Sequence, residues 1–478
     1  MKTKTRICSI LLVVLLLLCG MSAHALAQQY DVIVAGSGMA GLSAALTAAQ
    51  QGASVILFEK LGVMGGSTAL SAGAILKSGE EGNAEGTPTV AEIAEYITEL
   101  NNGNIDPALR GKVLGMGNDT ITWIEQTGLP LFEGNSSAPG DPDLCNFKKV
   151  APNVDENGDM VMGGGSKLIA SLAAACETAG VTICLNSPVT ALLTDETGAV
   201  TGVTVTPKDA EPVNYAAKSV VLATGSYVMN DTLIAEAAEY LLDFRHFGPA
   251  GDTGDAIYMG RAVGADTKFS DCVSIGTYGF AATGFNSSDH SLYITGDGER
   301  FVNETSFYSR VFRAMRLKYL EGTKSFFAIY DSTYTKADPE AAVAAGTMFK
   351  ADTLEELAGL MGVDTAKLQA TVDRYNANKG IDDPDFGKPA AYMTGLAEKG
   401  PYYASIIMPA YTATFGGLYI DENAHIMKAD GTCVKNLYGA GACASSTFLW
   451  EDYPYSGTCI LYAAATGRIA GENAALGK

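Results

Sequence analysis

Residues 30–60 read "YDVIVAGSGMAGLSAALTAAQQGASVILFEK" and carry the strongest structural signal in the chain. The apolar run "DVIVAG" predicts a buried strand, and "AGLSAALTAAQQG" has the composition of a helix that follows a glycine-rich turn. The run "ASVILF" predicts a second strand, which ends in an acidic residue. This order of strand, turn, helix, strand and acid is typical of a dinucleotide-binding unit built on a parallel sheet.

The glycines and the acid of this unit each have a physical task. Gly36, Gly38 and Gly41 fit the pattern G-x-G-x-x-G: the first permits a tight turn, the second lets the backbone approach a pyrophosphate, and the third lets helix and strand pack closely. The helix N-terminus favours phosphate, and Glu59 can accept hydrogen bonds from ribose hydroxyls. The predicted cofactor contacts here are Gly36, Gly38, Met39, Ala40, Gly41, Glu59 and Lys60.

The loop that follows Glu59 favours FAD over NAD. It reads "KLGVMGGSTALSAGAI", and a plain NAD-binding domain does not need its Gly-Gly-Ser-Thr run. FAD enzymes use such a loop to reach the flavin end of the cofactor. We therefore predict bound FAD, with loop contacts at Gly65, Gly66, Ser67, Thr68, Ser71 and Gly73.

Three later segments favour a flavoprotein with two dinucleotide-binding-type folds. Residues 181–205 alternate like the strands of a β-hairpin, and "KSVVLATGSY" at 218–227 predicts a returning strand that closes on a glycine turn. Residues 251–266, "GDTGDAIYMGRAVGAD", predict a glycine-rich turn that enters a helix. These segments add Val189, Ala223, Thr224, Gly225, Thr253, Gly254 and Asp255 to the predicted cofactor contacts.

Residues 1–27 have the pattern of a secretory signal peptide. Lys2, Lys4 and Arg6 precede a short apolar run, and the small residues "ALA" at 25–27 end it. The run is shorter than the roughly 20 residues that span a bilayer, so we expect an exported, extracytoplasmic bacterial protein without stable membrane insertion. Cleavage would remove three basic and no acidic residues and take the formal net charge from −21 to −24, which argues against nucleic acid as a partner.

The chain contains no recognisable electron relay or metal site of its own. Beyond the signal peptide only His246, His290 and His425 remain, and the seven cysteines there show no C-x-x-C, haem-attachment or iron–sulfur spacing. Only one dinucleotide fingerprint is present, and nicotinamide cofactors are scarce outside the membrane. We therefore expect electrons to come from a separate protein, such as an exported cytochrome or a membrane-linked flavin carrier, as in anaerobic respiration.

Eight motifs follow one another in this chain: "VIVAGSGMAGLSAAL", "GGSTALSAG", "VVLATG", "TGDAIYMG", "GERFVNE", "TFGGLYID", "NLYGAGACAS" and "TGRIAG". Their order resembles the fumarate reductase/succinate dehydrogenase flavoprotein superfamily, which includes soluble fumarate and urocanate reductases and ketosteroid dehydrogenases. The resemblance implies an α/β fold with a Rossmann-like FAD domain and an inserted α+β capping domain. The predicted limits are 28–264 and 411–478 for the two parts of the FAD domain and 265–410 for the cap, with a further FAD contact at Gly441.

The resemblance also implies a chemistry. A hydride moves between flavin N5 and a carbon, a protein group moves a proton at the adjacent carbon, and the C–C double bond made or lost lies next to a carbonyl. In fumarate reductases the proton carrier is an arginine after an "RF-x-NE" stretch; here Arg310 lies two residues later than that spacing. Tyr308 lies where ketosteroid dehydrogenases carry a catalytic tyrosine, and packing at the domain junction is its alternative role.

Two carboxylate-binding positions of the fumarate reductases differ here. Ala413 stands where their histidine precedes an "MGG" turn, and "YPYSGTC" at 453–459 stands where their arginine precedes the last helix. Both differences argue against a dicarboxylate substrate. Ketosteroid dehydrogenases have Tyr-Pro-Gly-x-Gly at the second position, which implies that the Tyr453 hydroxyl and the Gly457 N–H bind a substrate carbonyl oxygen.

The same segment leads into the last predicted helix. Ser456 and Thr458 are residue types favoured at a helix N-cap, so we predict that they cap this helix. The positive end of the helix would stabilise negative charge on reduced flavin, and the predicted FAD contacts here are Ser456, Thr458, Cys459 and Ile460. Tyr455 departs from the ketosteroid dehydrogenase pattern, and two interpretations remain open: it narrows the pocket, or it stacks on a planar substrate.

Three functions remain open. The first is an exported reductase of a C=C bond conjugated to a carbonyl, in an enone or enoate that is aromatic or steroid-like, with fumarate- or urocanate-type reduction as a variant. The second is the reverse reaction, a dehydrogenase of saturated ketones. The third is a flavin electron-transfer module that is not an enzyme, although a cap of about 145 residues has the size of a domain.

Overall fold

The structure is a computed structural model that describes residues 27–78, 89–135, 146–151, 153–154, 160–161, 163–273, 276–280, 291–333 and 339–478. Apart from Ala27, the predicted signal peptide lies outside the described residues, and so does His290. None of the helices in these ranges has the length and apolar character that crossing a bilayer requires.

Helices and strands alternate along most of the chain. In chain order they are β1 (Ala27–Ala35), α2 (Met39–Gln50), β2 (Val55–Phe58), α3 (Gly66–Leu70), β3 (Ala74–Leu76), α4 (Val90–Leu100), α5 (Pro107–Gly115), α6 (Gly117–Glu125), β4 (Phe132–Asn135), β5 (Asn146–Lys149), β6 (Asn153–Val154), β7 (Met160–Val161), α7 (Gly165–Thr178), β8 (Thr182–Cys184), β9 (Val189–Thr194), β10 (Val200–Val205), β11 (Val213–Leu222), α8 (Asp231–Ala238), η1 (Glu239–Asp243), β12 (Arg245–His246), α9 (Asp255–Ala262), β13 (Thr267–Val273), β14 (Gly276–Phe280), β15 (Leu292–Thr295), α10 (Tyr308–Leu320), β16 (Phe326–Asp331), α11 (Pro339–Ala344), β17 (Phe349–Ala351), α12 (Leu354–Met361), α13 (Thr365–Ala377), η2 (Ala390–Tyr392), β18 (Tyr402–Tyr411), β19 (Thr414–Leu418), β20 (His425–Met427), β21 (Cys433–Gly439), η3 (Gly441–Cys443) and α14 (Thr458–Leu476).

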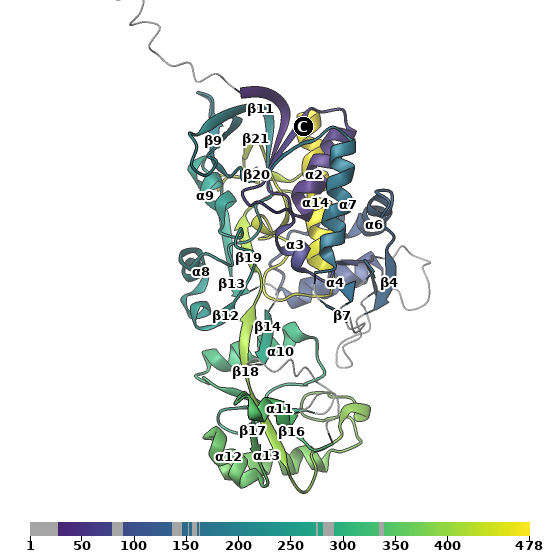
Figure 1. Cartoon of the computed structure of the whole chain (residues 1–478), viewed down its shortest axis with the longest axis vertical. Helices are drawn as coiled ribbons and strands as arrows, with labels where there is room; N and C mark the ends of the chain where they lie inside the picture. Colours follow the sequence, from purple (N-terminus) through teal and green to yellow (C-terminus); the bar gives the residue numbers. More distant parts are fainter. Residues whose placement is uncertain are drawn as a thin grey trace, which may run out of the picture.

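An eight-stranded sheet forms the upper part of the molecule in Figure 1. Its main path has the order β20-β21-β11-β1-β2-β8, and β1 pairs in parallel with both β11 and β2. The pairs β2–β8 and β11–β21 are also parallel, which confirms the predicted parallel sheet. Val32, Ile33 and Val34 of β1 are all fully buried, as is typical of a parallel sheet whose two faces are covered.

The hairpin predicted within residues 181–205 is confirmed. β9 and β10 pair antiparallel, and β10 pairs antiparallel with β11, the returning strand that was predicted from "KSVVLATGSY". The hairpin therefore extends the parallel sheet from the middle of its path at β11.

Helices α2 and α14 pack against each other beside α7, on one side of the sheet (Figure 1). The approach is so close that two positions of α14 have no room for a side chain. A Cβ atom on Gly467 would lie 2.3 Å from the carbonyl oxygen of Ala40, and one on Gly471 would lie 2.2 Å from that of Ala44. The last helix of the chain is thereby held against the first described helix.

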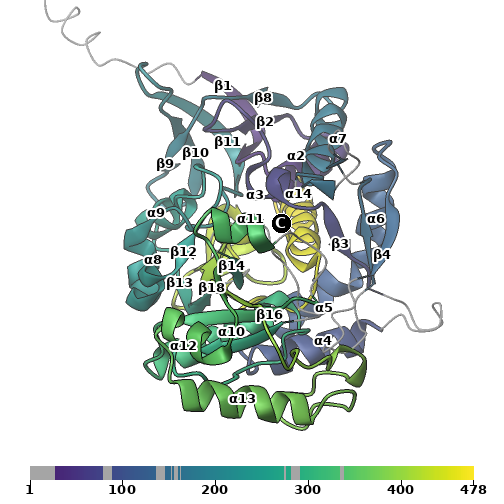
Figure 2. The ribbon, with the colours of Figure 1, turned by 60° about the horizontal axis from the view of Figure 1, so that its bottom comes forward.

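A second, six-stranded sheet forms the lower part of the molecule (Figures 1 and 2). β18 pairs with β12, β14, β16 and β17, and β15 pairs with β16. Alternate residues of β15 face opposite ways: Leu292 packs in a core with residues of α12 and α13, and Tyr293 packs in a core with residues of α10. The sheet therefore fixes the place of α10, whose first residue is Tyr308.

The predicted cap, residues 265–410, contains most of this second sheet. Two strand pairs cross its predicted limits: β12 pairs with β18, and β13 pairs with β19. We keep the limits 28–264, 265–410 and 411–478 as a proposal.

Replacing one glycine at the contact between α2 and α14 tests how tightly the helices pack. Gly467→Ala is expected to lower the thermal unfolding midpoint, at a cost of about 1–3 kcal/mol, because the added methyl group meets a backbone oxygen that has nowhere to move. Gly359→Ala in α12 is the matched control: no heavy atom lies within 4 Å of its added Cβ, so the change should stabilise the protein by about 0.5–1 kcal/mol. Equal midpoints for the two variants would contradict the described contact.

Candidate active site

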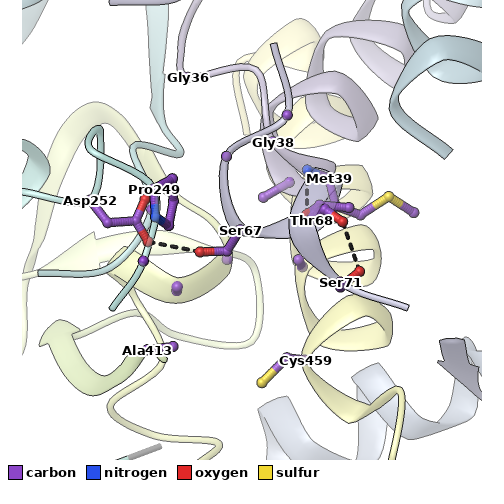
Figure 3. A pocket seen from close by; sticks show the side chains of 18 of the residues that line it. Gly36, Gly38, Met39, Ser67, Thr68, Ser71, Pro249, Asp252, Ala413 and Cys459 are labelled. Atoms are coloured by element: carbon purple, nitrogen blue, oxygen red, sulfur yellow. Dashed lines mark hydrogen bonds between the residues drawn. The ribbon is translucent and has the colours of Figure 1, made fainter. Parts of the chain in front are cut away.

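A cavity of about 960 Å³ lies where the parallel strands end. The residues that directly follow β1, β2, β11 and β21 all line it, which is the place where sheets of this kind bind ligands. Further wall comes from some of the residues in the segments 247–255 and 449–463, from residues 412–415, and from Tyr308 at the start of α10. Figure 3 shows part of this wall.

Most of the residues predicted to bind FAD line this one cavity, although they come from distant parts of the chain. Those that line it are Gly36, Gly38, Met39, Ala40, Glu59, Lys60, Gly65, Gly66, Ser67, Thr68, Ser71, Gly73, Val189, Ala223, Thr224, Gly225, Asp255, Gly441, Ser456, Cys459 and Ile460. Of the predicted catalytic residues, Tyr308, Tyr453 and Gly457 line it as well.

The turn between β1 and α2 leaves space for a phosphate group. A Cβ atom on Gly36 would lie 2.2 Å from the carbonyl oxygen of Ala223, so the protein's own backbone requires this glycine. A Cβ on Gly38 would have no neighbour nearer than 3.8 Å, and Gly38 lines the cavity, so its glycine leaves room for a ligand. The N-cap Gly38 makes no side-chain cap, the Met39 N–H donates to the Thr68 hydroxyl at 3.3 Å, and the N–H groups that follow in this turn can bind phosphate. The residues present fit FAD.

Glu59 lies directly after β2 and is 9% exposed. Its Oε2 accepts hydrogen bonds from the backbone N–H of Ser37 at 3.1 Å and from the Ser37 hydroxyl at 2.6 Å. Its Oε1 accepts one from the N–H of Leu61 at 2.8 Å. Because a carboxylate has about four lone-pair sites, Glu59 can still accept from a ribose hydroxyl. Ser37, which the sequence reasoning missed, orients this acid.

Lys60 connects the end of β2 to the turn before α9. Its Nζ donates to Thr253 Oγ1 at 2.6 Å and lies 2.8 Å from Asp255 Oδ2. Lys60 and Asp255 line the cavity, whereas Thr253 lies behind them and does not. The predicted role of Thr253 as a direct cofactor contact therefore changes to one of holding the lysine.

Asp252 is the main polar residue of the cavity that the sequence reasoning missed. It is buried, lines the cavity, and accepts a hydrogen bond from the Ser67 hydroxyl at 3.0 Å (Figure 3). It also accepts one from the Ser226 hydroxyl at 2.9 Å. Burial raises the pKa of its carboxyl group. Its position in "GDTGDA", between two predicted turn residues, was the available signal.

Gly41, Gly254 and Thr458 are also outside the cavity lining, for reasons of packing. A Cβ on Gly41 would lie 1.9 Å from the carbonyl oxygen of Gly36, so this glycine serves the contact between turn and helix. Gly254 is the N-cap of α9, with a φ of +77° that favours glycine. The Thr458 hydroxyl donates to the carbonyl oxygen of Tyr455 at 2.9 Å.

The predicted capping of α14 by Ser456 and Thr458 is wrong. The N-cap is Gly457, with a φ of +89°, and no side chain caps the helix. A Cβ on Gly457 would lie 2.5 Å from the backbone nitrogen of Leu76, so only glycine fits. The N-terminus of α14 lies at the cavity, which Gly457, Cys459 and Ile460 line.

Two tyrosines face each other at this end of the cavity. The rings of Tyr308 and Tyr453 have centroids 6.4 Å apart and planes inclined by 30°. The N–H of Gly457 donates to the Tyr453 hydroxyl at 3.0 Å, so the two predicted carbonyl-binding groups lie together. Burial raises the pKa of Tyr453 well above its ordinary value, and the phenol stays a neutral hydrogen-bond donor.

Arg310 does not line the cavity, and its guanidinium is bonded to residues outside the cavity lining and to the backbone of Tyr453. Its guanidinium lies 2.7 Å from Asp452 Oδ2 and donates to the Tyr96 hydroxyl at 2.7 Å and to the Tyr453 carbonyl oxygen at 3.2 Å. The structure thus places the second candidate proton carrier behind the tyrosines rather than beside a substrate.

The tyrosine end of the cavity carries no described cationic side chain. Among the described residues that line the cavity, Lys60 is the only lysine or arginine, and it is paired with Asp255. Ala413, which the sequence resemblance predicts to stand in place of the histidine of fumarate reductases, lines the wall. Tyr455 is buried, does not line the cavity, and packs against Tyr96 with ring centroids 4.9 Å apart, so neither interpretation from the sequence applies to it.

The remaining wall is largely apolar, and the sequence analysis did not predict its residues as part of the site. Phe247, Pro249, Phe415 and Leu449 belong to loops and strands whose composition is ordinary for packing. Only the folded arrangement brings them to one cavity.

The chain matches the family model described as FAD binding domain over residues 31–452. It belongs to this FAD-binding family. The match confirms FAD as the cofactor and the predicted fold class. The urocanate reductase of Eggerthella lenta is 28% identical, over 94% of this chain and 75% of that protein. The vinyl phenol reductase of Lactiplantibacillus plantarum is 26% identical, over 94% of this chain and 97% of that protein.

The fold of this FAD-binding protein also matches a solved structure closely. The 3-ketosteroid-Δ4-(5α)-dehydrogenase of Rhodococcus jostii superposes with a TM-score of 0.78 at 24% identity, covering 95% of this chain and 99% of that one. The family match and the similarity to the urocanate reductase confirm the predicted resemblance to this superfamily, and the superposition confirms the fold. The protein is an FAD-dependent oxidoreductase of the class that acts on CH–CH groups.

The two glycines of the first turn should respond differently to substitution. Gly38→Val is expected to leave the apoprotein folded but to weaken FAD binding by at least about 100-fold, because the side chain fills space that only a ligand uses. Gly36→Val should instead prevent folding, because its Cβ meets the Ala223 carbonyl oxygen. Circular dichroism and titration of the apoprotein with FAD measure the two effects. A Gly38→Val protein that binds FAD normally would contradict the assignment.

Proposed function

We propose that this protein reduces a C=C bond conjugated to a carbonyl group, in an enone or enoate with an aromatic or steroid-like body. FAD bound in the cavity would supply the hydride. The observation that carries the proposal is the pair formed by Tyr308 and Tyr453, facing each other at the wall of the cavity with the Gly457 N–H beside them. Similarity to a urocanate reductase and a vinyl phenol reductase supports the direction of reduction.

Tyr453 and Gly457 hold the carbonyl oxygen. The Gly457 N–H and the Tyr453 hydroxyl lie within 3.0 Å of each other, so an entering oxygen can accept from both in place of their mutual contact. Two donors at a buried site stabilise the negative charge that develops on this oxygen when the double bond receives a hydride. The raised pKa of Tyr453 keeps its proton in place for this role.

Tyr308 delivers the proton. The hydride adds to one carbon of the double bond, and the Tyr308 hydroxyl protonates the carbon next to the carbonyl, so that one hydride and one proton saturate the bond. Solvent then restores the proton to Tyr308, which is only partly buried. Among the described residues of α10, Tyr308 is the only one that lines the cavity, so it is the proton donor that this helix can offer.

The described wall of the cavity argues against a dicarboxylate substrate. A carboxylate in a protein cavity is usually held by arginine or another cation, and the one described lysine or arginine of the wall is paired with Asp255. The wall instead offers tyrosine, phenylalanine and leucine side chains to a planar apolar body.

The protein works outside the cytoplasm and receives its electrons from a separate cytochrome or flavin carrier. The signal-peptide pattern of residues 1–27 supports export, and the absence of haem and iron–sulfur spacing in the sequence supports an external donor. A net charge of −24 after cleavage favours a donor with a basic surface. Anaerobic respiration is the setting that this combination suits.

A dehydrogenase of saturated ketones is the second candidate, because the segment "YPYSG" resembles that of the ketosteroid dehydrogenases. The same tyrosines would then remove a proton and hold the carbonyl. An electron-transfer module without a substrate would have no need for the paired tyrosines at the cavity wall.

Tyr308→Phe tests the proton donor. The variant should keep the absorption spectrum of bound FAD and lose about 10²–10⁴-fold in turnover, because only the hydroxyl is removed. Tyr319→Phe, on the same helix with its hydroxyl bonded to Asp243, is the control and should stay within about twofold of the wild type. Unchanged turnover in Tyr308→Phe would remove this residue from the mechanism.

A substrate screen tests the reaction itself. The enzyme is reduced with dithionite and mixed anaerobically with benzalacetone, cinnamate and fumarate, and reoxidation of the flavin is followed by absorbance. We expect benzalacetone to reoxidise it fastest and fumarate slowest, because the described wall lacks an unpaired cation. Failure of all three, together with dye reduction by a saturated 3-ketosteroid, would instead establish the dehydrogenase.

A further inference from the structure

Residues 450–457 carry both Tyr453 and Gly457, and we call them the tyrosine segment. From one side the segment is held by the end of α4. Asn101 is fully buried, and its Oδ1 accepts hydrogen bonds from the backbone N–H groups of Trp450 at 2.8 Å and Glu451 at 2.8 Å. Within the FAD domain, therefore, the segment has a fixed support.

From the other side the segment is held by α10, the helix that begins with Tyr308. The Ser309 hydroxyl donates to the carbonyl oxygen of Tyr453 at 2.9 Å, and the Arg310 guanidinium donates to the same oxygen at 3.2 Å. Asp452 Oδ1 accepts from the N–H of Tyr453 at 2.8 Å, while its Oδ2 lies 2.7 Å from Arg310. Both backbone polar groups of Tyr453 are thus bonded to α10 or to a carboxylate paired with it.

We propose that Ser309, Arg310 and Asp452 are positioning residues, which couple Tyr308 to Tyr453 so that the two hydroxyls keep one spacing across the substrate. The proposal rests on the proposed function. Ser309 and Arg310 directly follow Tyr308 in one helix, so any shift of α10 that moves Tyr308 must also break their bonds to the tyrosine segment. Displacement of a reacting group by about 1 Å can cost 10²-fold in rate.

The contacts of Arg310 favour this role over proton transfer. Its guanidinium has partners on Asp452, Tyr96 and the backbone of Tyr453, and an arginine side chain does not lose its proton in proteins. Asp452 is 3% exposed and its second cationic neighbour, Arg313, is 3.9 Å away, so Arg310 is its close partner.

A double-mutant cycle separates positioning from general support of the fold. Asp452→Asn keeps the shape and the acceptor for Tyr453 but removes the charge that pairs with Arg310. We expect Asp452→Asn to lower kcat for benzalacetone reduction about 10- to 100-fold in the wild-type background. In the Tyr308→Phe background the same change should lower kcat less than twofold, because the Tyr308 hydroxyl that it would misplace is already absent. An equal loss in both backgrounds would overturn the proposal. Lys318→Gln, which breaks an exposed ion pair on the same helix, is the control, and it should leave kcat unchanged in both the wild-type and the Tyr308→Phe background.

A second measurement needs no substrate. In holoenzyme labelled with 3-fluorotyrosine, the fluorine resonances of Tyr308 and Tyr453 are assigned by their loss in the two phenylalanine variants. Both resonances should move in Asp452→Asn and in the milder variant Ser309→Ala, and neither should move in Lys318→Gln. If neither benzalacetone nor the other substrates reoxidise the flavin, the proposed function is wrong. These spectra would still show whether Tyr308 and Tyr453 are coupled. Unmoved resonances in Ser309→Ala and Asp452→Asn would overturn the proposed coupling of Tyr308 to Tyr453. If Asp452→Asn does not fold, the spectrum of Ser309→Ala alone decides.

Discussion

The contact between the backbones of α2 and α14 is the constraint on which the rest of the structure depends. Gly467 and Gly471 of α14 lie so close to the carbonyl oxygens of α2 that no side chain fits between the helices. Because Gly38 is the N-cap of α2 and Gly457 that of α14, and both line the cavity, this contact brings two helix N-termini to one cavity. The positive ends of both helices would therefore favour negative charge on a cofactor held in this cavity.

Much of the FAD domain could be predicted from the sequence because its signals are local. The strand, turn and helix of residues 30–60 follow from apolar runs and from glycines at fixed spacing, and the structure has all three. Most of the predicted FAD contacts line the cavity because they lie directly after strands whose carboxyl ends meet. Asp252 was missed because its neighbours Thr253 and Gly254 carry the same turn signal, and only the folded chain shows which of the three faces inward.

The errors at the tyrosine segment have a tertiary cause. Ser456 and Thr458 have the right chemistry for an N-cap, but the N-cap is Gly457, which has a positive φ and lies where a Cβ would come within 2.5 Å of the Leu76 nitrogen. Spacing after "RF-x-NE" could not show that Arg310 turns away from the cavity, because its partner Asp452 is far along the chain. The ring contact between Tyr455 and Tyr96 is equally remote in sequence.

The placement of charge in this region follows one pattern. Glu451 and Asp452 meet Arg313 and Arg310 behind the tyrosines, so the acids and bases neutralise one another outside the cavity. A buried pair such as Arg310–Asp452 adds little net stability, because removing both ions from water costs about as much as their attraction returns. The pair instead fixes geometry. The planar guanidinium of Arg310 contacts both the Asp452 carboxylate and the Tyr453 carbonyl oxygen, and so holds α10 and the tyrosine segment in one relative arrangement. The sequence resemblance predicts the tyrosine segment at the place where fumarate reductases carry a carboxylate-binding arginine, and in this structure Arg310 instead donates to the backbone carbonyl oxygen of Tyr453.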